Sequence, residues 1–372
     1  MVTTRSTKAA LVSLIACTSL VLGACSEQSD SAAPAGGSES AGDMDLSGAT
    51  GKLTAEGATS QQKAMEYFRT KYGAAVSGSS FDYTATGSGS GQKQFINGTV
   101  DFGGSDSPLS DEQAEKAKQR CGGNDAWHLP LVIGPVAVAY KIDGVDNLNL
   151  SPDVLAQIFG GKIAKWNDPA IAALNDGATL PDSDIKVIYR SEESGTSDNF
   201  QKFLKAAAPD NWSTTGKSFP TATGSGANGS KGVITEVSAT EGSITYVEAG
   251  FAKGVDGVGV ASLDFGDGPV ELNADNVGVA LDHLKYKGEG HNMIVDANAL
   301  FSMKEKGAYP LVLTTYEIVC SAGYQDDNTT NMVKDFLKVA LANQDSELEN
   351  KGYIPVKGAY KEKLEAAVDA IK

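Results

Sequence analysis

Residues 129–142 read LPLVIGPVAVAYKI, the strongest apolar run in the folded part of the chain, interrupted once by Gly134-Pro135. A short apolar run of this kind predicts a buried strand. Strand-like and helix-like stretches alternate around it. We predict further strands at 99–103, 185–190 and 310–320, and helices at 59–72, 111–120, 153–159, 197–208 and 330–343. Such alternation is typical of an α/β architecture.

The helix predicted at 59–72 carries Ala64, Phe68 and Tyr72 at intervals of four residues, which gives it one apolar face. Thr59 is followed three residues later by Gln62, which predicts a capping box at the start of this helix.

Length and composition indicate a globular chain of about two domains, with 372 residues, 41% hydrophobic content and a mean hydropathy of −0.20. Lys plus Arg is 31 and Asp plus Glu is 47, so the formal net charge is −16. This balance argues against a nucleic-acid binder, because phosphate backbones are contacted by Lys and Arg. The negative net charge does not exclude a protein that binds a small anion through local dipoles in a closed cleft.

The N-terminus has the features of an exported protein. Arg5 and Lys8 precede the apolar stretch 9–22, which is too short to span a bilayer comfortably. The sequence LGAC at 22–25 resembles the bacterial lipobox, which implies a signal peptide of residues 1–24 and diacylglycerol on Cys25. We therefore expect a protein anchored by lipid on the outer face of the cytoplasmic membrane. An ordinary signal peptide with a chance cysteine is the alternative.

Residues 26–50 are Ser, Ala, Gly and acids with almost nothing to bury, so we predict a flexible tether over 25–50 and a folded part from Gly51. Cys121 and Cys320 then remain as an even pair in an oxidising compartment. A disulfide is the default expectation, and two buried free thiols are the alternative.

Catalytic signatures are missing from the sequence. His128, His283 and His291 are scattered, and no H-E-x-x-H, G-x-S-x-G or Walker A pattern occurs. The stretch 224–229 matches G-x-G-x-x-G, but no clear strand precedes it, so we do not interpret it as a nucleotide site. We expect packing or surface histidines, no enzyme, no metal site and no cofactor.

Four clusters of small residues lie at predicted strand-to-helix switches, at 56–60, 87–91, 103–107 and 190–197. A helix N-terminus presents unpaired N–H groups and the positive end of the helix dipole, and small hydroxyl residues let an anion approach them. Each cluster alone is explained equally well as turns and caps. Four in one chain, one of them opening with Arg190, favour an oxyanion site.

Three charged residues refine this hypothesis. Arg190 can donate two parallel hydrogen bonds to an oxyanion, and Glu192 either pairs with it on the surface or orients it. Asp106 would repel a fully deprotonated anion and accept a proton from a protonated one. Phosphate keeps a proton near neutral pH and sulfate does not, so Asp106 would select phosphate.

These residues resemble those of the extracytoplasmic phosphate-binding proteins of bacterial phosphate ABC importers. The motifs that carry the resemblance are Gly57-Ala-Thr59, Gly87-Ser88, Val100 to Asp106, Gly161 to Asp168, Arg190 with Ser194 to Ser197, and Gly242 to Glu248. The positions that match the family's phosphate ligands are Thr59, Ser60, Ser88, Asp106, Arg190, Ser194, Gly195 and Thr196. The resemblance implies that Ser60 binds phosphate through its backbone, that Asp106 accepts the phosphate proton and that Glu192 steadies the arginine.

Two positions depart from the family pattern. Ser60 stands where an aromatic residue is common, and Glu193 stands where a glycine is common and adds charge near the site. The resemblance implies the two-lobed fold of type II periplasmic binding proteins, with two hinge crossovers. We assign 51–134 and 309–372 to lobe 1 and 135–308 to lobe 2, with hinges at Gly134-Pro135 and near Ala308 to Pro310.

The expected partners are inorganic phosphate, the transmembrane subunits of an ABC permease, and the membrane through Cys25. Three alternatives remain open: a carrier of another protonated oxyanion such as arsenate, an exported phosphate-ester hydrolase with Ser194 or Thr196 as nucleophile, and a surface adhesin or phosphate sensor.

Overall fold

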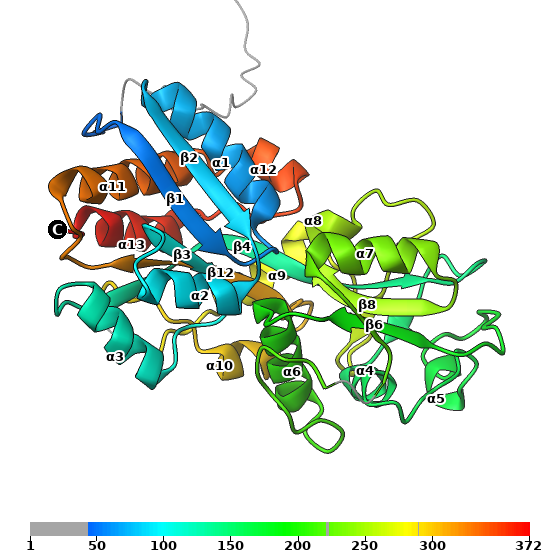
Figure 1. The fold of residues 1–372 in the computed structure, drawn as a ribbon. Coiled ribbons are helices and arrows are strands. Elements are labelled where there is room, and N and C mark those ends of the chain that lie inside the picture. The colour runs from blue at the N-terminus through cyan, green and yellow to red at the C-terminus, as the bar shows by residue number, and fades with distance from the viewer. Residues whose placement is uncertain (1–43, 221–222, 289) are drawn as a thin grey trace, which may run out of the picture. The chain divides into compact units, whose positions relative to one another are not determined.

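The computed structural model describes residues 44–220, 223–288 and 290–372 (Figure 1). The signal peptide predicted at 1–24 and the lipidation predicted at Cys25 lie outside the described residues. No helix among the described residues is long and apolar enough to cross a membrane.

Strands and helices alternate along the chain, as predicted. The strands are β1 (Gly51–Gly57), β2 (Ser79–Ala85), β3 (Phe102–Ser105), β4 (Ala126–Lys141), β5 (Asn149–Leu150), β6 (Lys186–Arg190), β7 (Ser225–Ala227), β8 (Ser243–Glu248), β9 (Gly259–Val260), β10 (Ser262–Asp264), β11 (Pro269–Val270) and β12 (Val312–Cys320). The helices are α1 (Gln62–Ala75), α2 (Ser88–Ile96), α3 (Asp111–Arg120), α4 (Pro152–Phe159), α5 (Pro169–Ala172), α6 (Gly195–Ala207), α7 (Gly229–Ala239), α8 (Ala249–Ala252), α9 (Ala274–Asp282), α10 (Ala297–Phe301), α11 (Asp327–Ala342), α12 (Ser346–Asn350) and α13 (Gly358–Asp369).

Nine strands form one curled sheet in the order β2-β1-β3-β12-β4-β8-β6-β7, with β9 beside β4. β1 is parallel to β2 and β3, and β8 is parallel to β6, which is parallel to β7. β4 and β12 are antiparallel to each other and join the two parallel groups. A small sheet of β11, β10 and β5 lies apart from this path.

The buried strand predicted at 129–142 is confirmed as part of β4, which runs without a break through Gly134-Pro135. The pair marks a change of partner: residues 126–135 pair with β12, and residues 136–141 pair with β8. A proline fits at such a point because it has no N–H to donate to the ladder. The Val136 N–H beyond it is bonded to the Leu311 carbonyl at 2.9 Å.

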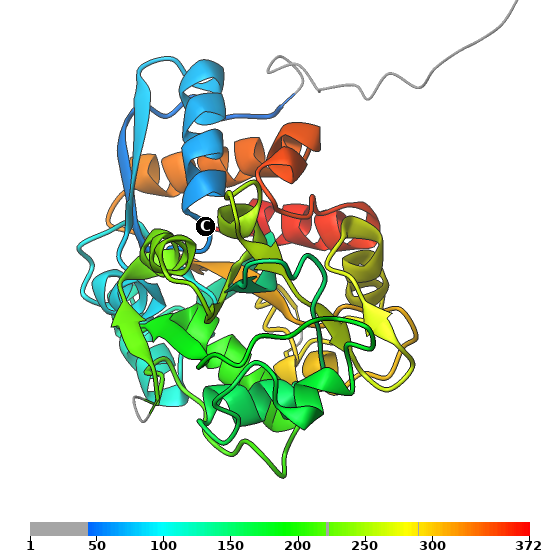
Figure 2. The same cartoon turned by 90° about the vertical axis from the view of Figure 1, so that its right-hand side faces the viewer.

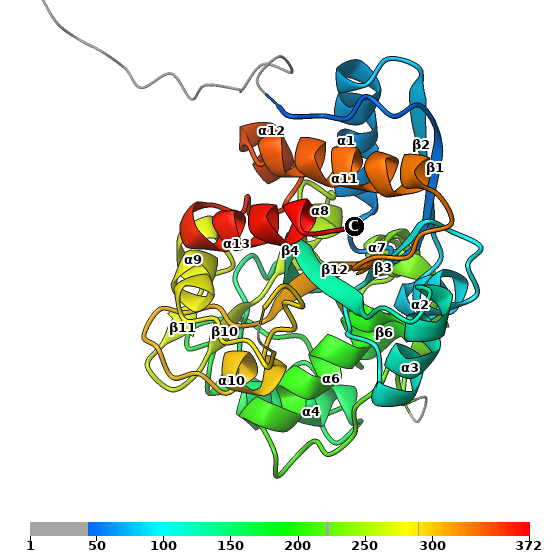
Figure 3. The ribbon, with the colours of Figure 1, turned by 90° about the vertical axis from the view of Figure 1, so that its left-hand side faces the viewer.

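The segment from β1 to α3 and the segment from β12 to α13 lie together, apart from the middle of the described chain. Figure 2 shows the blue strands and α1 beside the orange-to-red helices, and Figure 3 shows α11 and α13 next to one another. In this half Phe336 of α11 contacts Phe81 and Phe102, with ring centroids 4.1 and 5.4 Å apart. In the other half Phe200 stacks on Tyr246 at 4.5 Å. Each half thus has its own group of packed aromatic rings, and both groups belong to one continuous hydrophobic core.

Several predicted elements match the structure closely, and α3 matches residue for residue. The strand expected at 99–103 lies at Phe102–Ser105. The capping box predicted from Thr59 and Gln62 is wrong, because α1 begins only at Gln62 and its N-cap residue makes no side-chain bond. The Thr59 hydroxyl is engaged elsewhere, as described below.

Residues 47–48 belong to the folded part, although we expected a tether up to residue 50. The Ser47 and Gly48 N–H groups and the Ser47 hydroxyl all donate to the Asp335 carboxylate, at 2.9, 3.0 and 2.7 Å. Composition alone did not reveal this contact, because its acceptor lies on α11, far along the chain.

Cys121 and Cys320 form a disulfide, with a Cα–Cα distance of 5.4 Å. This confirms the predicted pair and excludes the alternative of two free thiols. The bond joins the C-terminal end of α3 to the end of β12.

Candidate anion-binding site

The predicted small-residue clusters meet where strands end and helices begin. β1 and β3 are parallel neighbours, so their carboxyl ends at Gly57 and Ser105 lie at the same edge of the sheet. β6 ends at Arg190 in the other parallel group. The N-termini of α1, α2, α6 and α7 follow these ends or contact them. An anion among them would meet N–H groups that have no partner within their own helices.

Arg190 is at the centre of this arrangement and is 2% exposed. Its guanidinium donates to the Thr59 hydroxyl at 2.6 Å, to the Thr196 hydroxyl at 3.3 Å and to the Ser230 hydroxyl at 3.4 Å. These three hydroxyls come from the starts of α1, α6 and α7. One buried cation therefore gathers residues from distant parts of the chain.

Glu192 holds this arginine from behind. Its carboxylate accepts from Arg190 Nε at 2.7 Å and forms an ion pair with Nη2. Both carboxylate oxygens also accept from the Gly229 N–H, at 3.2 Å each, at the N-terminus of α7. The pair is largely buried, and Glu192 orients the guanidinium rather than forming a surface salt bridge with it.

Asp106 faces the arginine from the end of β3. Ser60 and Thr315 donate their hydroxyls to its Oδ1, at 2.7 and 2.8 Å, and Thr196 donates to its Oδ2 at 3.2 Å. Burial raises the pKa of this carboxyl above its usual value. The three hydroxyl bonds and the charge of Arg190 oppose that rise by favouring the ionised form.

Ser88 and Gly195 bring the two halves of the chain into contact. The Ser88 hydroxyl, at the start of α2, accepts from the Asp106 N–H at 3.0 Å. Gly195 opens α6, and a Cβ built there would lie 2.3 Å from Ser88 Oγ. Ser194 is the N-cap of α6 and accepts from the Ser197 N–H at 3.2 Å. Only a glycine at position 195 permits α6 to approach Ser88 this closely.

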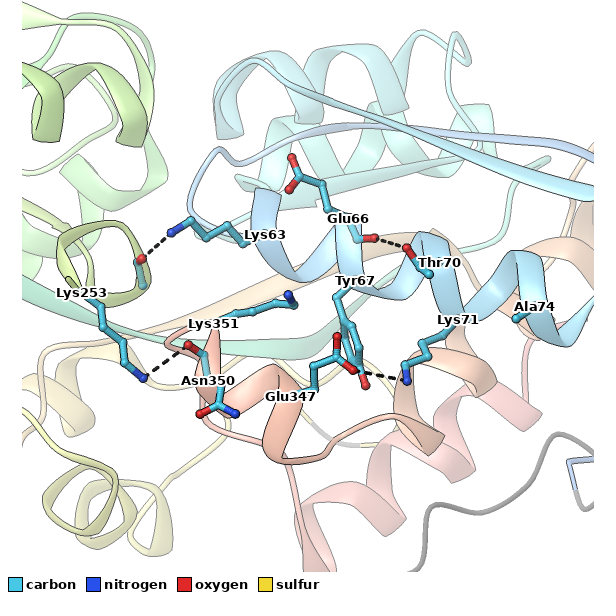
Figure 4. A pocket seen from close by; sticks show the side chains of 11 residues that line it. Lys63, Glu66, Tyr67, Thr70, Lys71, Ala74, Lys253, Glu347, Asn350 and Lys351 are labelled. Atoms are coloured by element: carbon cyan, nitrogen blue, oxygen red, sulfur yellow. Dashed lines mark hydrogen bonds and ion pairs between the residues drawn. The ribbon is translucent and has the colours of Figure 1, made fainter. Parts of the chain in front are cut away.

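A separate groove of about 800 Å³ is lined by four lysines, two on α1, one directly after α12 and one directly after α8 (Figure 4). Lys63 donates to the Gly250 carbonyl at 2.5 Å, Lys253 donates to the Asn350 carbonyl at 3.3 Å, and Lys71 pairs with Glu347 at 3.5 Å. Three of the four lysines are therefore engaged with protein oxygens, and the fourth, Lys351, lies over the Tyr67 ring with its Nζ 5.7 Å from the ring centroid. We therefore place the candidate anion site at Arg190 and not in this groove.

Comparison with known proteins identifies the family. Residues 34–344 match the model of the PBP superfamily domain. The chain is 41% identical over 368 residues to phosphate-binding protein PstS 3 of Mycobacterium tuberculosis, which covers 97% of this chain and 98% of that protein. It is also 41% identical over 367 residues to PstS 2 of the same species, covering 97% and 98%. The chain belongs to the PstS family of phosphate-binding proteins.

A solved structure confirms the fold expected for a PstS protein. A periplasmic phosphate-binding protein (PfluDING), solved with bound phosphate, matches with a TM-score of 0.71 and 24% identity, over 85% of this chain and 93% of that one. The predicted two-lobed α/β fold of periplasmic binding proteins is therefore correct.

All eight positions expected to bind the ligand lie at this junction in the PstS fold. They are Thr59, Ser60, Ser88, Asp106, Arg190, Ser194, Gly195 and Thr196. Ser60 differs from the expectation in one respect, because its side chain also bonds to Asp106. Glu193 directs its carboxylate to Lys93, 2.6 Å away, so its charge is paired outside the site.

Ser230 and Thr315 were missed by the sequence analysis. Ser230 is fully buried, and its N–H and hydroxyl both contact the Thr59 hydroxyl, at 3.1 and 3.0 Å. It follows directly on the glycine pattern at 224–229, so the signal was present as another Gly-Ser helix start. Thr315 stands inside an apolar strand, where no local pattern marks it.

The three histidines of this PstS-family chain, all within the described residues, lie away from Arg190. His128 is buried and accepts from the Leu109 N–H at 3.0 Å, and burial lowers its pKa to about 4. His283 bonds to the Val279 carbonyl of its own helix. His291 packs against Trp127, with ring centroids 5.1 Å apart. The expectation of packing and surface histidines is confirmed.

Proposed function

We propose that this protein binds one inorganic phosphate ion between its two lobes and delivers it to an ABC-type phosphate permease. The observation that carries the proposal is the buried pair of Arg190 and Asp106, held 2% exposed among hydroxyls at helix N-termini. A site for any anion would need the arginine and the dipoles. The carboxylate is useful only when the anion brings a proton to donate.

In this proposal the phosphate takes over donors that the side chains now share among themselves. Arg190 donates two parallel bonds to phosphate oxygens, with Glu192 keeping it in place. Thr59, Ser60, Ser88, Ser194, Gly195 and Thr196 provide hydroxyl and backbone donors, and the phosphate proton goes to Asp106. Sulfate has no such proton, so its oxygens would face the carboxylate without a hydrogen bond.

The proposed lobes are 51–134 with 309–372, and 135–308, joined at Gly134-Pro135 and near residues 308–310. The strand pairing supports this division, since β4 changes its partner between Pro135 and Val136 and the first residue of β12 pairs with Pro135. Thr59, Ser88 and Asp106 would then belong to one lobe, and Arg190 and Thr196 to the other. Phosphate would hold the lobes together by bonding to both.

The proposed location is the outer face of the cytoplasmic membrane. Residues 1–24 would be removed as a signal peptide, Cys25 would carry the lipid, and residues 26–46 would serve as the tether. The permease subunits are the expected protein partners.

We propose binding without catalysis. For an ester hydrolase, Ser194 or Thr196 would need a general base within hydrogen-bond reach. The Ser194 hydroxyl caps α6 and has no hydrogen bond to a base among the described residues. The Thr196 hydroxyl does donate to a carboxylate, that of Asp106, but it also accepts from Arg190, and in this proposal Asp106 receives the proton of the phosphate. Both hydroxyls therefore have structural partners. A chromogenic phosphate ester incubated with the protein should release no product.

The test is calorimetry on the chain from residue 26, freed of bound ligand and titrated with phosphate and with sulfate. Tight one-to-one phosphate binding and no heat with sulfate are expected. Arg190→Ala should weaken phosphate binding by roughly 1.5–3 kcal/mol, the value of a hydrogen bond to a charged group. Arg69→Ala is the control, because Arg69 is exposed and faces Asp82 at 3.7 Å. Equal phosphate affinity in both variants would remove Arg190 from the site.

A further inference from the structure

The two oxygens of Asp106 have different surroundings. Oδ1 accepts two hydroxyl bonds, from Ser60 at 2.7 Å and from Thr315 at 2.8 Å. Oδ2 accepts one bond at 3.2 Å, from Thr196 at the start of α6. Two strong donors on one oxygen fill its usual acceptor capacity and fix the rotation of the carboxylate. The less occupied oxygen is the one that faces Arg190's cluster of hydroxyls.

We propose that Thr315 is a specificity-determining positioning residue: together with Ser60 it occupies Oδ1, keeps Asp106 ionised, and leaves Oδ2 as the acceptor for the proton of a protonated oxyanion. This inference rests on the proposed phosphate binding and extends it to the source of selectivity.

The reason lies in what a neutral Asp106 would do. A protonated carboxyl is a hydrogen-bond donor, and a donor at this position could bond to an oxygen of sulfate as readily as to an oxygen of phosphate. Burial pushes Asp106 toward that neutral form, and hydroxyl donors push it back. Discrimination between the two anions therefore depends on bonds such as the one from Thr315, although Thr315 need not touch the ligand.

Other titratable groups around Asp106 do not replace this role. They are Tyr83 on β2, Arg190 on β6, Asp198 on α6, Glu248 on β8, Tyr316 and Glu317 on β12, and Tyr353 after α12. Arg190 favours the ionised carboxylate. Burial raises the pKa of Glu317 to about 8 and raises that of Glu248 well above its usual value, so burial favours the neutral form of both carboxyls. Asp198 is paired with Lys202 at 2.6 Å.

The backbone of β12 is irregular at this residue. The register between β12 and β4 shifts between Thr315 and Tyr316, so that Thr315 faces Val132 and Tyr316 faces Pro130. A bulge of this kind changes the direction of a side chain relative to a regular strand. Thr315 is 1% exposed, so its hydroxyl has no water to bond and is committed to Asp106.

The experiment uses Thr315→Val, which keeps the shape and removes the donor. Phosphate and sulfate are titrated calorimetrically into the chain from residue 26 at pH values from 8 to 5. In the wild-type protein, sulfate binding should emerge only at the acid end. In the variant, sulfate binding should appear at a pH roughly 0.5–1 unit higher. At the midpoint of the wild-type pH profile of sulfate binding, the variant should bind sulfate roughly fivefold more tightly, which is the effect of one hydrogen bond.

Thr314→Val is the matched control, because the neighbouring hydroxyl bonds to Tyr316 at 3.4 Å and not to Asp106. Ser60→Ala removes the other donor to Oδ1, keeps the backbone, and should shift sulfate binding in the same direction. It also provides the test if Thr315→Val does not fold. An unchanged sulfate profile in both donor variants, or a loss of phosphate affinity without a gain for sulfate, would overturn the inference. Absence of phosphate binding in the wild-type protein would instead overturn the proposed function.

Discussion

Replacing Gly195 by alanine tests whether the ligand is held by the direct contact of the two halves of the chain. The added Cβ would lie 2.3 Å from Ser88 Oγ, 2.6 Å from Asp106 Cβ and 3.0 Å from Asp106 Oδ2. Ordinary van der Waals contact begins at 3.4 Å, so the partners must separate by about 1 Å. One of these obstacles is the Cβ of Asp106, which is bonded directly to the backbone and cannot rotate away from the added methyl group.

The size of the effect follows from the bonds that this separation breaks. Thr196 donates to Asp106 at 3.2 Å, and a further 1 Å takes the pair beyond hydrogen-bond range. Phosphate could then bond fully to the N-terminus of α6 or to Asp106, but not to both. Loss of one charged hydrogen bond costs roughly 1.5–3 kcal/mol, so phosphate should bind about 10-fold to 100-fold more weakly.

The assay is phosphate calorimetry together with thermal unfolding, with and without phosphate. Without ligand, Gly195→Ala should unfold near the wild-type temperature, since the proposed lobes can move apart as units. Added phosphate should raise its unfolding temperature less than it raises that of the wild-type protein. Gly278→Ala in α9 is the control, because nothing lies within 4 Å of its added Cβ. Wild-type phosphate affinity in Gly195→Ala would refute the reasoning.

Three further predictions follow from single contacts. Asp106→Asn should place its amide oxygen toward Ser60 and Thr315 and its NH₂ toward the ligand, so sulfate should become a ligand in calorimetry; continued exclusion of sulfate would contradict the selectivity argument. Replacing Cys121 and Cys320 together by serine should lower the free energy of unfolding by roughly 2–5 kcal/mol in urea titrations. The affinity of the folded protein for phosphate should stay unchanged. His128 has a pKa of about 4 in the folded chain and about 6.5 unfolded, so the unfolded chain binds the extra proton between these values and stability falls as pH drops through that window. From pH 7 to 5 the wild-type protein should lose about 2 kcal/mol more than His128→Gln, and equal losses would count against this role.

The sequence predicted the fold class and the small-residue clusters of the site because both depend on local patterns. Apolar runs of strand length and helices with one apolar face survive in any α/β arrangement, which is why α3 was predicted to the residue. The small-residue clusters also predicted helix starts at an anion site. Their convergence needed the resemblance to a family, since no local pattern says which strand ends are neighbours.

The failures have a common physical cause, which is competition from distant residues. Thr59 has the sequence of an N-cap, but its hydroxyl contacts Arg190 and Ser230 instead of the first turn of α1. Residues 47–48 have the composition of a linker, but Asp335 supplies an acceptor for them. In each case a buried or half-buried partner, more than 100 positions away, outweighs a weak local preference.

A chain with a net charge of −16 can hold an anion because the relevant electrostatics are local. At physiological ionic strength the Debye length is about 8 Å, so exposed acids beyond that distance are largely screened at the site. Arg190 is buried and much less screened, and Glu192 offsets part of its charge while fixing its direction. The remaining attraction comes from the first N–H groups of α1, α2, α6 and α7, which are neutral donors and add no net charge. Asp106 then makes the balance depend on the proton that the anion carries. The arrangement of a few buried charges and dipoles therefore determines which anion this site binds, and the net charge of the chain does not.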